Sequence, residues 1–164
     1  MNLLSLSRRT GKALKKKGQT LVTAESCTGG WVAQAVTSVA GSSDWFERGY
    51  VTYSNAAKRA DLGVPKATLL RHGAVSEPTA RAMALGALAR SRAGQRRRRS
   101  FIALAITGIA GPGGGAPGKP VGTVCFAWAQ GRRIRSETRR FRGGRSRVRR
   151  QSVIHALRGV LKWL

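Results

Sequence analysis

The sequence predicts a layered α/β domain with a mixed β-sheet. Segments with helical spacing of apolar residues alternate with short apolar runs of strand length. Residues 121–130 and 134–141 read as two strands around a turn at Gly131, which favours an antiparallel hairpin, and a closing helix is expected at 145–164. The chain of 164 residues has the size of one domain, so we expect a single domain over residues 1–164.

The first half of the chain begins with an amphipathic helix and continues with a strand, a turn and a second helix. Residues 3–17 carry apolar side chains at helical spacing, and Gly18 stands where a helix C-cap would. A short strand at 20–24 is followed by a helix at 31–39, whose apolar residues form one stripe that we expect to be buried. The β-branched and aromatic residues of 46–54 predict a second strand.

The middle of the chain predicts three helices and then a central strand. A short helix at 55–60 and one more turn at 66–71 precede a longer helix at 76–92, which has Ser at its N-cap and Pro in its first turn. The basic run 96–99 is interpreted as a linker. Residues 101–106 are continuously apolar, which predicts a strand buried on both faces.

The charge balance is unusual, because 31 Lys and Arg residues face only six acidic residues, for a formal net charge of +25. Much of the excess lies in residues 15–17, 96–99 and 132–150. Such a field attracts nucleic acid, acidic lipid surfaces and phosphorylated small molecules without choosing among them. We interpret the charge as a basic solvated surface without a dedicated polyanion site, and an Arg-rich coding bias would produce the same count.

The cysteines and histidines exclude several classes of protein. Cys27 and Cys125 form neither a disulfide framework nor a metal-ligand spacing, and His72 and His155 are isolated. No apolar run has the length of a membrane span, and the first residues lack the apolar core of a signal peptide. We therefore expect a soluble cytoplasmic protein with no metal and no membrane partner.

Residues 23–30, with the sequence TAESCTGG, join a short strand to a helical pattern through a turn of small residues. This arrangement predicts that Ser26 or Cys27 lies at a helix N-terminus, where free N–H groups favour an anion or a developing oxyanion. Ser and Thr at such a place are more often helix caps, and that alternative stays open on this segment alone.

A Gly- and Pro-rich loop over residues 107–120 leaves the predicted central strand. Such a loop exposes backbone N–H groups and lets the main chain approach a ligand closely. Neither phosphate-loop pattern fits, because the sequence has no G-x-x-x-x-G-K-[ST] and no helix follows the glycines. A flexible connector is the alternative interpretation of this segment.

Several blocks of the sequence resemble the CinA C-terminal domain family and cover nearly the whole chain in the family's order. The blocks are residues 24–30 (AESCTGG), 41–43 (GSS), 46–55 (FERGYVTYSN), 72–77 (HGAVSE), 107–112 (TGIAGP) and 119–123 (KPVGT). The characterised activity of this family is that of a nicotinamide-nucleotide amidohydrolase. The family's other common form carries an extra N-terminal domain that this chain lacks, so the resemblance implies the stand-alone amidase.

The resemblance implies a three-layer α/β/α sandwich. It also implies hydrolysis of the carboxamide of nicotinamide mononucleotide to nicotinate mononucleotide and ammonia, a step of pyridine nucleotide recycling, with no metal or cofactor. It places the nucleophile on Ser26, its lysine partner on Lys58 and the family's tyrosine on Tyr53. It also implies a homo-oligomer. The family's oxyanion, nucleotide and phosphate contacts would fall on Cys27, Thr28, Gly29, Gly30, Thr107, Gly108, Gly111, Gly113, Gly114 and Arg145.

The chemistry of amide hydrolysis supports this assignment independently. Neutral serine is a weak nucleophile, so Ser26 needs a base, and Lys58 can serve if burial and neighbouring positive charge lower its pKa from about 10.4. Backbone N–H groups around Cys27 and Thr28 would stabilise the oxyanion, each worth about 3 kcal/mol. Without the resemblance, Tyr53 would be read as a core aromatic and Lys58 as an exposed helix lysine.

Cys27 is the rival nucleophile, because a cysteine with Glu25 and Lys58 would imitate a nitrilase-type amidase. The family pattern favours Ser26, and a small buried thiol is the ordinary interpretation of Cys27. The chain departs from the family at two positions, with Gly144 where Asp is common and Ala56 where Glu is common. The first loses a carboxylate beside Arg145, which weakens the assignment of the phosphate to that arginine.

The second hypothesis for function is a nucleic-acid-associated binding module without catalysis, linked to competence or DNA damage. The net charge and the arginine clusters favour it. The sequence has no nucleic-acid fold signature and no basic groove rich in aromatic residues, so we expect at most weak, nonspecific binding of nucleic acid.

Overall fold

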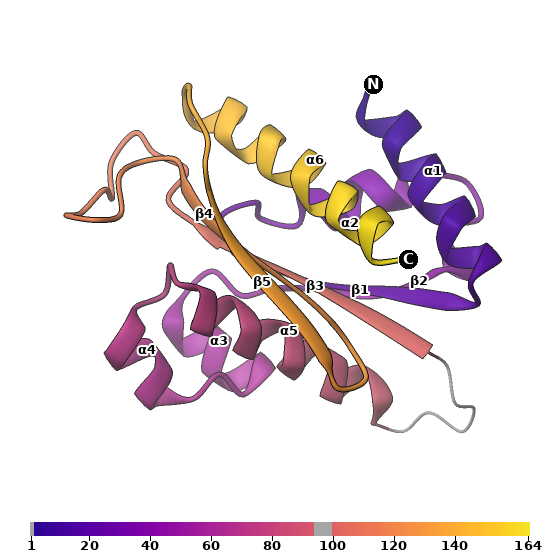
Figure 1. Cartoon of the computed structure of the whole chain (residues 1–164), viewed down its shortest axis with the longest axis horizontal. Helices are drawn as coiled ribbons and strands as arrows, with labels where there is room; N and C mark the ends of the chain where they lie inside the picture. The colour runs from indigo at the N-terminus through magenta and orange to yellow at the C-terminus, as the bar shows by residue number, and fades with distance from the viewer. Residues whose placement is uncertain (1, 94–99) are drawn as a thin grey trace.

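In the computed structural model, which describes residues 2–93 and 100–164, five strands form one mixed sheet (Figure 1). Their order across the sheet is β2-β1-β3-β4-β5. β1 pairs in parallel with both β2 and β3, whereas β4 pairs antiparallel with β3 and β5. The strands are β1 (Gln19–Glu25), β2 (Phe46–Val51), β3 (Ser100–Gly108), β4 (Thr123–Gln130) and β5 (Arg133–Arg140).

Helices cover both faces of this sheet (Figure 1). One face carries α1 (Leu3–Lys16), α2 (Trp31–Thr37) and α6 (Arg145–Trp163), and a short 3₁₀ turn at Ser42–Asp44 follows α2. The other face carries α3 (Asn55–Leu62), α4 (Lys66–His72) and α5 (Glu77–Arg92). The predicted α/β class, mixed sheet and antiparallel hairpin are confirmed, and the linker expected at 96–99 lies outside the described residues.

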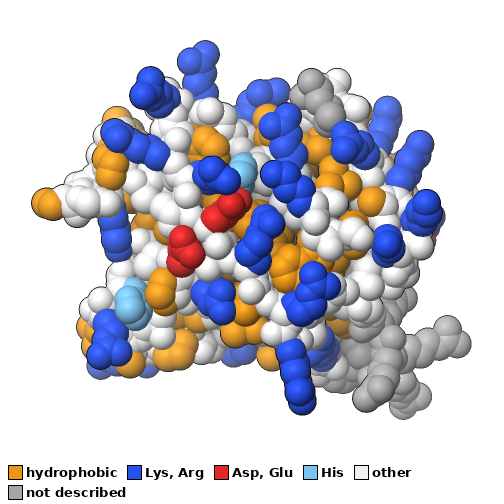
Figure 2. All heavy atoms as spheres, viewed as in Figure 1, with side chains coloured by type: hydrophobic (Ala, Val, Ile, Leu, Met, Phe, Trp, Pro, Cys, Tyr) orange, Lys and Arg blue, Asp and Glu red, His pale blue; other side chains and the backbone are white. Residues whose placement is uncertain are grey.

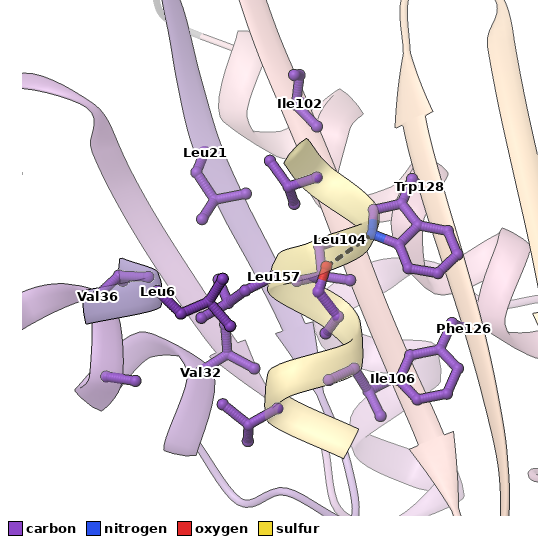
Figure 3. Close-up of a cluster of buried hydrophobic side chains, with 14 of the residues drawn as sticks. Leu6, Leu21, Val32, Val36, Ile102, Leu104, Ile106, Phe126, Trp128 and Leu157 are labelled. Carbon is purple, nitrogen blue, oxygen red and sulfur yellow. Dashed lines mark hydrogen bonds between the residues drawn. The ribbon is translucent and has the colours of Figure 1, made fainter. Parts of the chain in front are cut away.

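The central strand β3 separates two hydrophobic cores. Ile102, Leu104 and Ile106 of this strand point to the α6 face, where they meet the aromatic rings of β4 (Figure 3). The alternate residues, among them Ala103 and Ala105, point to the α5 face. Successive side chains of a strand point to opposite faces, so the continuous apolar run is the pattern of a strand buried on both sides, as predicted.

Small residues on the buried side of α5 let that helix lie close to the sheet and to α3. Ala80, Ala84 and Ala87 of α5 are fully buried. A Cβ atom added at Gly86 would collide with the carbonyl oxygen of Leu62 at the end of α3. The close approach of α5 at Gly86 to the end of α3 therefore limits where α3 can lie. This matters for the site, because α3 carries the predicted catalytic residue Lys58.

Several predicted boundaries differ from those of the structure. The second strand ends at Val51 rather than at 54, because the Ser54 side chain accepts a hydrogen bond from the Ala57 N–H at 3.0 Å and caps α3. The helix predicted at 31–39 ends at Thr37. The hairpin begins at Thr123 rather than at 121, because Gly122 has a φ of +91° and turns the chain into β4.

Lys and Arg side chains are spread over the whole face shown in Figure 2. Several acidic residues are already paired, with Asp44 to Lys15 at 2.8 Å and Glu137 to Arg139 at 3.1 Å. Among the described residues, none of the helices combines the length and hydrophobicity that spanning a bilayer requires.

Candidate active site

The candidate site lies where the three parallel strands end. Ser26 directly follows β1, Tyr53 follows β2, and Thr107 and Gly108 close β3. The chain leaves β1 toward α2 on one face and leaves β2 toward α3 on the other. Ligand sites of α/β sheets form where neighbouring strands send their connections to opposite faces, and this edge has that topology.

The structure brings Ser26 and Lys58 into direct contact across 32 positions of sequence. Lys58 Nζ donates to Ser26 Oγ at 3.1 Å and to the carbonyl oxygen of Thr52 at 3.0 Å. Ser26 is 7% exposed and Lys58 is 1% exposed. The alternative interpretation of Lys58 as an exposed helix lysine is therefore wrong.

Burial lowers the pKa of Lys58 below the ordinary value of 10.5, because removal from water disfavours the charged ammonium. No carboxylate in the described part of the chain forms an ion pair with it. The neighbouring positive charge that the sequence analysis invoked is not among the causes, and burial alone lowers this pKa. A lysine with a lowered pKa has a larger neutral fraction and can accept the proton of a serine hydroxyl.

The rival nucleophile Cys27 lies in an unsuitable environment. Burial raises the pKa of its thiol to about 12, so the reactive thiolate is scarce at neutral pH. Glu25, its proposed helper, is also occupied, because its carboxylate accepts hydrogen bonds from the N–H groups of Val32 and Ala33. The geometry thus favours Ser26 over Cys27 as the nucleophile.

Glu25 also corrects the prediction that Ser26 or Cys27 lies at a helix N-terminus. α2 begins only at Trp31, and a turn over residues 27–30 separates Ser26 from it. The Glu25 carboxylate accepts hydrogen bonds from the N–H groups of Val32 and Ala33, in the first turn of α2, at 3.0 and 2.9 Å. Its Oε2 also accepts a hydrogen bond from Thr28 Oγ1 at 2.7 Å. The positive end of the helix is therefore neutralised by Glu25, and Ser26 is neither at this end nor its cap.

The turn after Ser26 leaves two backbone amides without a carbonyl partner. The N–H of Ser26 donates to the carbonyl oxygen of Ile106 at 3.0 Å. No carbonyl group among the described residues accepts from the N–H groups of Cys27 or Thr28. These are the two donors that the sequence analysis expected to stabilise an oxyanion, and that role stays a prediction.

Tyr53 and Arg145 form the outer part of the site. Tyr53 is 60% exposed, so its interpretation as a core aromatic is wrong. Arg145 donates to the Tyr53 hydroxyl at 2.9 Å and to the carbonyl oxygen of Gly111 at 2.8 Å. The Tyr53 hydroxyl is hydrogen-bonded to Arg145, and no such bond joins it to Ser26 or Lys58 in the described structure.

These residues surround a pocket of about 260 Å³. It contains most of the predicted site: Ser26, Cys27, Tyr53, Lys58, Thr107, Gly108, Gly111, Gly113, Gly114 and Arg145. The sequence analysis did not identify the other lining residues, Ala74, Val75, Ile109 and Ala110. Thr28, Gly29 and Gly30, expected as substrate contacts, do not line the pocket and instead form the turn that leads into α2.

The glycine-rich loop is held in place by hydrogen bonds at its base. The Ile109 N–H donates to the carbonyl oxygen of Thr123, and the Gly122 N–H donates to that of Ile109, both at 2.8 Å. Thr107 Oγ1 also donates to the carbonyl oxygen of Ala74 at 2.7 Å. The part of the loop that lines the pocket is thus anchored on both sides.

The sequence analysis did not identify Arg149. Its side chain contacts the main chain of the turn that follows Ser26, at the carbonyl oxygens of Cys27 and Thr28. The signal available was its spacing, because residues four apart share a helix face and Arg149 follows Arg145 by four.

In the described chain, no three His, Cys, Asp or Glu side chains are grouped so that they would hold a metal ion.

The family model of the CinA C-terminal domain matches residues 3–164. The chain is 55% identical over 157 residues to nicotinamide-nucleotide amidohydrolase PncC of Escherichia coli strain K12, covering 94% of this chain and 90% of that protein. It is 51% identical to the Pseudomonas putida protein of the same name, covering 98% and 96%. The crystal structure of the competence/damage inducible protein CihA from Agrobacterium tumefaciens matches with a TM-score of 0.89 and 45% identity, covering 98% of this chain and 94% of that one.

Proposed function

The chain belongs to the CinA C-terminal domain family, and from this premise we propose that it hydrolyses nicotinamide mononucleotide to nicotinate mononucleotide and ammonia. The two bacterial relatives named as nicotinamide-nucleotide amidohydrolases support the substrate, since each is more than half identical over nearly the whole chain. The observation that carries the proposal is the contact of 3.1 Å between Ser26 Oγ and the buried Lys58 Nζ at the floor of the pocket.

The proposed reaction proceeds through an acyl-enzyme. Ser26 Oγ attacks the carboxamide carbon, and its proton passes to the neutral amine of Lys58. The tetrahedral intermediate then collapses as the C–N bond breaks, and Lys58 returns the proton to the leaving nitrogen, which departs as ammonia. Water attacks the resulting ester while Lys58 accepts a proton from it. As the ester C–O bond breaks and the carboxylate leaves, Lys58 passes this proton to Ser26 Oγ, which restores both groups.

The remaining groups bind the charges of the substrate and the transition state. The amides of Cys27 and Thr28 are the proposed donors to the oxyanion, because the described chain offers their N–H groups no carbonyl acceptor. Arg145, at the outer edge of the pocket, is the proposed contact of the 5′-phosphate. Tyr53 stands between the two regions, and its hydrogen bond to Arg145 holds that guanidinium at the pocket.

The setting proposed for this activity is the cytoplasm and the recycling of pyridine nucleotides, in a homo-oligomer. These three elements rest on the family resemblance.

The proposal is tested by incubating the purified protein with nicotinamide mononucleotide and measuring ammonia and nicotinate mononucleotide in parallel. We expect both products in equal amounts. Nicotinamide riboside, which lacks the phosphate, should react with a lower kcat/KM because Arg145 loses its partner. No product from the mononucleotide under any buffer condition would refute the proposed activity.

A further inference from the structure

Arg149 contacts the backbone on which the nucleophile is mounted. Its Nε donates to the carbonyl oxygen of Cys27 at 3.1 Å, and its Nη2 donates to the carbonyl oxygen of Thr28 at 2.9 Å. The guanidinium also stacks on Trp31, with its central carbon 5.3 Å from the ring centroid. One rigid planar group thus joins α6, the turn after β1 and the first residue of α2.

These contacts determine the direction of the amides after Ser26. In a trans peptide the N–H points away from the C=O of the same unit, so the carbonyl of Cys27 sets the direction of the Thr28 N–H. Because Arg149 holds that carbonyl, the Thr28 N–H is directed away from Arg149. The carbonyl of Thr28 likewise sets the Gly29 N–H, which donates to the carbonyl oxygen of Ser26 at 2.9 Å.

A second support holds the same turn from inside the protein. The Glu25 carboxylate accepts from the Thr28 hydroxyl at 2.7 Å. Thr28 is therefore held through its side chain by Glu25 and through its carbonyl by Arg149. This leaves its N–H as the one polar group of the residue for which the described structure shows no protein partner.

Arg149 does not line the pocket, whereas Arg145, one helical turn earlier, does. We propose that Arg149 is a positioning residue, which holds the turn after Ser26 so that the N–H groups of Cys27, which lines the pocket, and of the adjoining Thr28 stabilise the oxyanion formed on Ser26. This proposal rests on the serine chemistry proposed above and adds a residue that acts through the backbone. The two neighbouring arginines of α6 thereby have different tasks, with Arg145 at the substrate and Arg149 at the turn.

The test compares Arg149→Met with wild type in kcat and KM for nicotinamide mononucleotide. A misdirected oxyanion donor weakens the transition state more than the bound substrate, so kcat should fall by about 10- to 100-fold. KM should stay within about twofold, since substrate binding does not use this donor. Arg150→Met is the matched control, because it removes the same charge from an exposed position of the same helix and should leave both constants unchanged.

Arg149→Lys is the second variant, in case Arg149→Met does not fold. It keeps the positive charge and the apolar stem over Trp31. Its single ammonium replaces a planar fork, so it should restore stability but only part of kcat. A raised KM with kcat preserved in either variant would overturn the proposal and make Arg149 a substrate contact. Unchanged constants in both folded variants would also overturn it.

A second readout separates this proposal from the proposed substrate. The rate at which a fluorophosphonate modifies Ser26, followed by intact mass, also depends on oxyanion stabilisation and needs no nucleotide. Slower labelling of Arg149→Met than of wild type supports the positioning role even if the mononucleotide is not hydrolysed. Equal labelling rates overturn the role, and a wild type that is neither labelled nor active overturns both proposals.

Discussion

Lys58 is the residue whose environment decides the chemistry. A charged ammonium that is 1% exposed and unpaired with a carboxylate would be costly, and the free energy falls when the amine becomes neutral. Its hydrogen bonds to Ser26 and to the Thr52 carbonyl fix the amine beside the hydroxyl. Burial thus destabilises the charged form of Lys58 and favours the neutral amine, which can act as a base.

This environment predicts the pH dependence of the reaction. The neutral form of Lys58 is the active base, so kcat/KM should rise with pH and level off above the pKa of this amine. Because burial lowers that pKa, the midpoint of the rise should lie clearly below 10.5. A pH–rate profile from pH 5 to 11 measures it, and a midpoint at or above 10.5 would contradict the assignment.

Lys58→Arg is the sharpest companion variant, because it keeps a positive charge that does not deprotonate in this range. We expect it to be inactive at every pH tested. Activity of this variant close to that of wild type would show that a different group removes the proton from Ser26.

At the residue scale, the family resemblance led to Ser26 and Lys58, while the spacing of the sequence alone did not join them. The two lie 32 positions apart and meet only because neighbouring strands deliver them to one edge of the sheet. The roles of Glu25 and Arg149 escaped prediction for a different reason. Most of their partners are backbone groups, which leave no residue-specific pattern in a sequence.

At the element scale, the position of α3 depends on its packing against α5. Gly86 allows the backbone of α5 to approach the carbonyl of Leu62, and an added methyl group would collide with it. Since α3 carries Lys58, a displacement of this helix also changes the distance to Ser26.

Gly86→Ala should therefore destabilise the protein and reduce turnover together. Helix propensity alone favours alanine by about 1 kcal/mol, but overpacking typically costs about 1 to 3 kcal/mol and a backbone atom yields little. We expect a lower melting temperature, measured by thermal unfolding, together with a lower kcat. A Gly86→Ala variant as stable as wild type would contradict the packing argument.

Elements with strong local signals were predicted well, and their ends were not. The continuous apolar run identified β3 as central, and the amphipathic spacing located α1, α5 and α6. The end of β2 was misplaced by three residues because Ser54 leaves the strand to cap α3, a choice that the β-branched composition hides. The end of α2 was also misplaced, at residue 39 instead of Thr37, whereas its start at Trp31 agrees with the prediction.

At the scale of the whole molecule, the net charge of +25 is the main property that the fold does not explain. Positive side chains cover the face in Figure 2 without gathering into one groove there. Such a field raises the local concentration of anions, and a phosphorylated substrate is an anion. The charge is thus compatible with the proposed amidase, and weak nonspecific binding of nucleic acid is expected from it as well.

This field predicts a dependence on salt. For nicotinamide mononucleotide, kcat/KM should fall several-fold between about 0.02 M and 0.5 M salt, because screening shortens the reach of the field to a few ångströms. The value of kcat should hardly change, since the bound substrate no longer depends on attraction from afar. Replacement by Gln of Lys12 and Lys16 on α1, and of Lys17 directly after it, should reduce the salt effect. A salt effect of unchanged size would show that it arises from charges at the pocket instead.

The central claim is that Ser26 is the nucleophile of an amidase, and ammonia release from nicotinamide mononucleotide by three proteins tests it most directly. Wild type, Ser26→Ala and Cys27→Ala should be assayed side by side after thermal unfolding shows all three to be folded. We expect wild type and Cys27→Ala to release ammonia and Ser26→Ala to lose at least about 10³-fold in rate. Turnover by Ser26→Ala together with a dead Cys27→Ala would contradict the claim and make the buried thiol the nucleophile.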